Sequence, residues 1–213
     1  MKDLLANKKN QPKNSEDTPQ YPLDGLKIAF ALTGSYCTLD TAISQMGKLR
    51  QMGAKILPII SHNVKINDTR FGTAASWKQK IEAAAGTYDI IDNIIDAEPI
   101  GPQAIADILV IAPCSGNTLG KLANGITDTP VVMAAKSHLR NSRPLLLAVA
   151  TNDGLSNSCK NIGLLLNSKN IYFVPFGQDD AFNKANSLVA DINLLPESIV
   201  AALAGKQIQP ILL

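Results

Sequence analysis

The chain has 213 residues, of which 46% are apolar and 18% charged, and its net charge at neutral pH is +2. This length suits one α/β domain whose core needs no disulfides, whereas the small charge and 5% aromatic content argue against a nucleic-acid-binding protein. No apolar run approaches the roughly 20 residues of a membrane-spanning helix. The two histidines, His62 and His138, lie far apart and form no metal-ligand motif.

The cysteines indicate a reducing compartment. Cys37, Cys114 and Cys159 are odd in number, widely spaced and without a CxxC pair, and no secretory leader is recognised. We therefore expect a cytoplasmic protein.

The first 20 residues differ in composition from the rest of the chain. They are rich in Lys, Asn, Gln and Pro and poor in large apolar groups, so burial would not offset the entropy lost on ordering them. We predict a flexible N-terminal tail at 1–20 and a single domain at 21–213.

From residue 26 onward, short apolar runs alternate with stretches of helical periodicity, which is typical of βα units around a parallel sheet. The predicted strands are 26–32, 55–60, 88–91 (the weakest), 107–112, 145–150 and 171–175. The predicted helices are 39–53, with a left-handed cap at Gly53, then 76–85, a helix through 119–123, 130–136 and 159–166. The pattern predicts an α/β fold with a buried sheet between helices.

Two predicted strands end in small, hydroxyl-bearing residues that precede a helix. The first runs into Thr33, Gly34 and Ser35, and the strand at 107–112 runs into 113–118. In an open parallel sheet, ligands lie beyond the carboxyl ends of the strands, where helix N-termini present N–H groups to anions. The segment TGSYCT lacks the GxGxxG dinucleotide pattern, and no Walker motif occurs. The sequence predicts a phosphate-binding cleft, with ordinary helix capping as the alternative.

The segments ALTGSYCT, APCSGNTLGKLANGITDTP and VATNDG resemble the flavoprotein family that includes phosphopantothenoylcysteine decarboxylases and flavin prenyltransferases. The resemblance spans roughly residues 26–175. It implies a Rossmann-like or flavodoxin-like three-layer sandwich with a parallel sheet. It also implies that FMN binds between subunits of a homo-oligomer, either a trimer or a dodecamer.

Further segments, among them SHNVK, NDTRFG, AEPIGP and NIYFVPFGQDD, resemble the family of dipicolinate synthase B subunits. Working beside an NAD(P)-dependent A subunit, that family converts dihydrodipicolinate to dipicolinate in the mother cell of sporulating bacteria. The resemblance therefore implies an oxidoreductase subunit with a dicarboxylate substrate. A non-catalytic scaffold or regulatory subunit that retains the fold is the alternative.

The resemblance assigns cofactor contacts to both loops. The residues concerned are Thr33, Gly34, Ser35, Pro113, Ser115, Gly116, Asn117 and Thr118, together with Asp128 near the next helix start. Ser35 would donate to the phosphate. No metal ligand is expected.

Two catalytic candidates follow, each with a structural alternative. Asn152 falls where the decarboxylases carry an asparagine that holds a substrate carboxylate. A role as a turn residue in TNDG explains the asparagine equally well. His62 follows the second strand and is a candidate base, with a structural hydrogen-bonding role as the alternative. Its segment, SHNVK, is not the decarboxylase histidine segment. The late segment PFGQDDAFNKANS has no cysteine, which counts against a decarboxylase of the cysteine-peptide type.

Cationic side chains are candidates for binding the substrate carboxylates. Arg70 in NDTRFG suits this role because its planar guanidinium grips a carboxylate with two hydrogen bonds. With Lys136, Arg140 and Arg143 it forms a testable set. A surface ion pair is the alternative for Arg70, and a solvated helix face is the alternative for Lys136 and Arg140.

Overall fold

The computed structural model describes residues 23–213. The predicted tail at 1–20 lies outside the described residues, and the boundary of the domain at residue 21 stays a prediction. Within the described part, one hydrophobic cluster runs from Leu23 to Ala202. No helix in this part of the chain is long and apolar enough to cross a membrane.

The sheet is mostly parallel, as predicted. Its strands are β1 (Lys27–Leu32), β2 (Lys55–Ile60), β3 (Ile108–Cys114), β4 (Leu145–Thr151), β5 (Ile171–Phe173), β6 (Phe176–Gly177) and β7 (Leu188–Ala190). The order β2-β1-β3-β4 continues into β5, and all these pairs are parallel. The first residues of β4 pair with β5, whereas its last two, Ala150 and Thr151, pair with β7. Strand β7 is antiparallel to β4 and to its other neighbour, β6. This antiparallel extension was not predicted.

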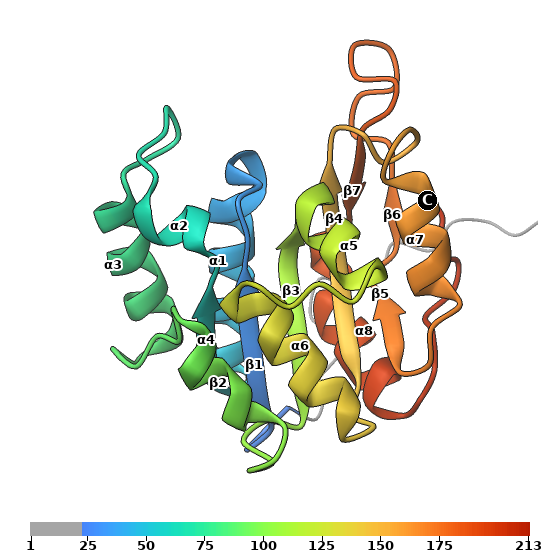
Figure 1. Ribbon diagram of the computed structural model, residues 1–213. Helices are drawn as coiled ribbons and strands as arrows, with labels where there is room; N and C mark the ends of the chain where they lie inside the picture. Colours follow the sequence, from blue (N-terminus) through green and yellow to red (C-terminus); the bar gives the residue numbers. More distant parts are fainter. Residues whose placement is uncertain (1–22) are drawn as a thin grey trace, which may run out of the picture.

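Helices cover both faces of the sheet (Figure 1), which confirms the three-layer sandwich. They are α1 (Tyr36–Gln51), α2 (His62–Ile66), α3 (Ala74–Ala85), α4 (Ile94–Ala97), α5 (Gly116–Ala123), α6 (Pro130–Arg140), α7 (Cys159–Leu166) and α8 (Leu195–Leu203), with short 3-10 turns at Glu98–Ile100 and Ile192–Leu194. In the view of Figure 1, α5, α6 and α7 lie in front of the sheet, and α1 and α8 lie behind it.

Local sequence explains the elements that hold the site. All seven residues of β3 are buried, as expected for a central strand covered on both faces. Helix α1 buries Leu39, Met46 and Leu49 on its sheet-facing side. Gly53 follows it with φ +95°, and a Cβ there would lie 2.7 Å from Oδ1 of Asp24, so the predicted left-handed glycine is confirmed.

Several local predictions differ from the structure. Residues 88–91 form no strand; Ile91 makes only an isolated bridge to Ile59, and Tyr88 is 85% exposed. Helix α6 starts at Pro130 as predicted but ends at Arg140, four residues later than expected, and its last turns bury Ser137 and His138. The helices α2, α4 and α8 were not predicted. Ser61 caps α2 by accepting a hydrogen bond from the Val64 N–H.

Candidate functional site

A cleft of about 500 Å³ lies at the carboxyl ends of β1, β3 and β4. It is where the fold places ligands, because the loops after parallel strands converge at this edge. Six of the residues predicted for the site line it: Gly34, Ser35, Arg70, Ser115, Gly116 and Asn152.

Hydrogen bonds join the two loops that the sequence predicted to be neighbours. The Thr33 hydroxyl donates to the Pro113 carbonyl at 2.6 Å and accepts from the Ser115 N–H at 3.0 Å. The Ser35 hydroxyl donates to the Ala150 carbonyl at 2.6 Å, which ties the first loop to β4. Thr33 is buried, so it fastens the loops together and does not line the cleft.

The two helix N-termini at the cleft differ in whether side chains cap them. Helix α5 is capped by Ser115, whose hydroxyl accepts from the Thr118 N–H at 3.4 Å. Its first residue, Gly116, lies against the Asp153 carboxylate, since a Cβ on Gly116 would be 2.8 Å from Oδ1 of Asp153. Helix α1 begins after Ser35 without any side-chain cap. The positive end of α1 is therefore the one available to an anion.

Arg70 adds a positive charge to the same cleft. It lies in the turn between α2 and α3, held by paired backbone hydrogen bonds between Thr69 and Gly72 at 3.0 and 3.1 Å. Its guanidinium carbon is 4.8 Å from the ring centre of Phe71, which also lines the cleft. Among residues 23–213, Arg70 makes no ion pair. Lys184 also lines the cleft but is paired with Asp179 at 3.1 Å, and that carboxylate raises the pKa of Lys184.

The remaining predicted residues do not line the cleft; they are Pro113, Asn117, Thr118, Asp128 and His62. Asp128 pairs with Lys121 at 2.7 and 2.8 Å, and this hydrogen-bonded ammonium lowers the pKa of the Asp128 carboxyl. Thr118 is buried beneath Ser115. His62 is exposed as the first residue of α2.

The predicted set of cations is wrong as a set, because the fold separates its members. Arg70 alone lines the cleft. Lys136 and Arg140 line a separate hollow beside α5 and α6, and Arg143 donates to the carbonyl of Ala106. Within the described part of the chain, no group of three His, Cys, Asp or Glu side chains is placed to hold a metal ion.

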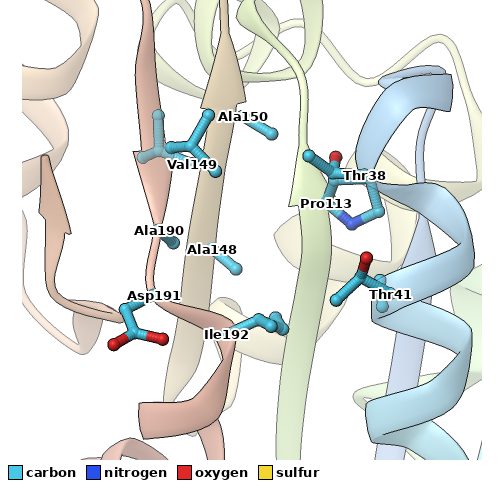
Figure 2. A pocket seen from close by; sticks show the side chains of 11 residues that line it. Thr38, Thr41, Pro113, Ala148, Val149, Ala150, Ala190, Asp191 and Ile192 are labelled. Carbon is cyan, nitrogen blue, oxygen red and sulfur yellow. The ribbon is translucent and has the colours of Figure 1, made fainter. Parts of the chain in front are cut away.

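An apolar pouch of about 230 Å³ adjoins the cleft and was not predicted. Figure 2 shows it between α1 and the sheet, with Thr38, Thr41 and the neighbouring Pro113 on one side and Ala148, Ala150 and Ala190 on the other. Ala150 and Val189 line both the pouch and the cleft, so the two spaces are adjacent. The alternate alanines of β4 were the available sequence signal for it.

Comparison with known proteins places this chain in a family. The flavoprotein family model matches residues 16–175. The dipicolinate synthase B subunit of Bacillus subtilis (strain 168) is 50% identical over 190 residues, which is 89% of this chain and 94% of that protein. The crystal structure of the dipicolinate synthase B subunit from Bacillus halodurans superposes with a TM-score of 0.82 at 46% identity, covering 90% of this chain and 97% of the other.

A more distant structure shares the fold. The FMN-dependent cysteine decarboxylase SpaF superposes with a TM-score of 0.60 at 19% identity, covering 85% of this chain and 97% of that one. The chain therefore belongs to the flavoprotein family, on the branch of the dipicolinate synthase B subunits.

Proposed function

We propose that the cleft binds a flavin nucleotide of the FMN type. The observation that carries this proposal is the combination of an uncapped helix N-terminus and Arg70 with an adjoining apolar pouch. Such a site suits a ligand with a phosphate at one end and a planar ring at the other. The cleft volume falls within the roughly 300–1,000 Å³ of small-molecule sites.

In this proposal the phosphate is held by the first backbone N–H groups of α1 and by Arg70. Ser35 was expected to donate its hydroxyl proton to the phosphate, but that proton is used on the Ala150 carbonyl. The Ser35 N–H is also used, on the Thr33 carbonyl at 2.9 Å, so we assign phosphate recognition to the backbone N–H groups that follow Ser35 in the first turn of α1. Ser115 and Gly116 form the facing wall. A bound flavin would supply a centre that accepts a hydride or electrons.

For the reaction, we propose that the protein works with an NAD(P)-dependent A subunit of dipicolinate synthase to convert dihydrodipicolinate to dipicolinate. The proposed setting is the cytoplasm of the mother cell of a sporulating bacterium, with the chain as a homo-oligomer. The 50% identity to a protein named for this synthase supports the proposal. Asn152 and Arg70, which line the same cleft, would orient the dicarboxylate and offset its charge. His62 lines neither the cleft nor the pouch, so its role as a base has less support.

Removing the Arg70 guanidinium is expected to weaken FMN binding by about 10- to 100-fold, because a hydrogen bond to a charged group contributes about 1.5–3 kcal/mol. The measurement is titration of the purified protein with FMN, followed by flavin absorbance and fluorescence. Arg140→Ala is the matched control, since Arg140 lines a separate hollow. When the protein is mixed with the A subunit, formation of dipicolinate should fall with Arg70→Ala and persist with Arg140→Ala. A wild-type protein that takes up no FMN would instead favour the non-catalytic scaffold.

Filling the pouch tests whether the ring enters it. Ala148 lines the pouch but not the cleft, and it is buried in β4. Ala148→Leu is expected to weaken FMN binding at least about 10-fold. Its free energy of unfolding should stay equal or rise, since the added carbons fill apolar space. Weaker FMN binding in a variant of equal or higher stability would mean that the side chain fills the ring's site and does not damage the fold. Unchanged FMN affinity in a stably folded variant would show that the ring lies elsewhere.

A further inference from the structure

Asp153, two residues beyond the end of β4, is held by several hydrogen bonds. Its Oδ1 atom accepts hydrogen bonds from the hydroxyls of Thr151 and Ser158, the second at 2.9 Å. Its backbone carbonyl accepts from the N–H groups of Ser156 and Ser158 at 3.0 and 3.1 Å. The same Oδ1 atom lies against Gly116 at the start of α5. The carboxylate is thus fixed by its own loop and by the neighbouring helix.

These contacts use only one of the two carboxylate oxygens. Within residues 23–213, Oδ2 of Asp153 makes no hydrogen bond, and Asp153 lines the cleft. The cleft therefore contains a fixed hydrogen-bond acceptor in addition to the anion site at α1 and Arg70.

We infer that Asp153 determines specificity by accepting a hydrogen bond through Oδ2 from an N–H or O–H group of the bound ligand. This inference rests on the proposed function, which places a flavin nucleotide in the cleft. A carboxylate in an anion-binding cleft repels a ligand that offers only acceptors, whereas a donor group turns the same contact into a charge-assisted hydrogen bond. The cleft thus selects ligands that combine an anionic group with a hydrogen-bond donor, such as a ring N–H or a sugar-alcohol hydroxyl.

The substitution Asp153→Asn tests this with little change of shape. The amide oxygen still accepts from Thr151 and Ser158, while the amide nitrogen replaces Oδ2 and turns an acceptor into a donor. We expect FMN to bind at least about 10-fold more weakly, because two donors then face each other. Sulfate, which has an anionic charge but no donor, should bind at least as tightly as to the wild type, because a negative charge has been removed from the cleft. Both ligands are measured by calorimetric titration of the full chain.

Ser158→Ala is the matched control. Ser158 is buried and does not line the cleft, and its loss removes a partner of Oδ1 while leaving Oδ2 unchanged. Its FMN affinity should stay within about 3-fold of the wild type. An equal loss of FMN affinity in both variants, or a parallel loss of FMN and sulfate in Asp153→Asn, would assign Asp153 a structural role only and overturn the inference. Unchanged FMN affinity in Asp153→Asn overturns it as well. If the wild type binds no FMN, the proposed function fails and this inference with it.

Discussion

The Gly101→Ala variant is expected to lose at least about 3 kcal/mol of unfolding free energy. A Cβ at Gly101 would lie 2.0 Å from the carbonyl oxygen of Ser137 and 2.5 Å from its carbon, so it would meet the backbone of α6. Gly101 is buried, and its N–H donates to the Ser137 hydroxyl at 3.1 Å. Its φ of −75° is accessible to any residue, so the cost is steric and not conformational. Relief requires the segment of α4 and the following turn to move away from α6.

Gly163→Ala provides the matched control for this prediction. Gly163 lies exposed inside α7, and a Cβ there would meet nothing within 4 Å. Because alanine favours the helix over glycine, this variant should be equal to the wild type or up to about 1 kcal/mol more stable. Urea unfolding followed by the fluorescence of Trp77, the single tryptophan, measures both variants. A loss below about 1 kcal/mol in Gly101→Ala would show that the α4 segment yields easily.

The central strands and several helices could be predicted because they are encoded by patterns of residues that are neighbours in sequence. Strands such as 55–60 and the helix at 159–166 match the structure residue for residue, since apolar runs and helical spacing reflect burial directly. The meeting of Thr33 with Ser115 followed from topology, because parallel strands bring their carboxyl ends to one edge.

The parts that escaped prediction depend on contacts between distant segments. A solvated helix face could be proposed for Lys136 and Arg140 from sequence, but only the packed fold shows that Arg70 lines the cleft. The three-residue strand β7 carries too short a pattern to be recognised. The fixation of Asp153 against Gly116 arises between two loops that are far apart in sequence.

His138 is a buried ionisable group that the proposed function does not use. Its side chain in α6 is 0% exposed, and no atom among residues 23–213 meets hydrogen-bond geometry with either ring nitrogen. Burial lowers the pKa of His138 from 6.5 to about 4, and the nearby charge of Arg143 acts in the same direction. The Pro144 carbonyl and Asp107 favour the protonated ring but do not outweigh burial.

This shift predicts a loss of stability in acid. The unfolded chain protonates His138 near pH 6.5, whereas the folded protein resists protonation until about pH 4, so the unfolded state binds more protons between these values. The stability due to neutral His138 is therefore complete above pH 6.5 and decreases as the pH falls toward 4. At about 1.36 kcal/mol per pKa unit, the loss amounts to roughly 3 kcal/mol. The carboxyl groups with lowered pKa values, such as that of Asp128, lose their contribution to the free energy of unfolding only below about pH 3.8.

His138→Met is expected to remove this slope, since methionine fills irregular buried space without an ionisable group. Urea midpoints at pH 7.5, 5.5 and 4.5 should decrease steeply in the wild type and change little in the variant. At pH 7.5 the variant should match or exceed the wild type, because two unpaired buried nitrogens are removed. His62→Gln is the control at an exposed position and should keep the wild-type slope. An unchanged slope in His138→Met would mean that another buried group titrates in this range.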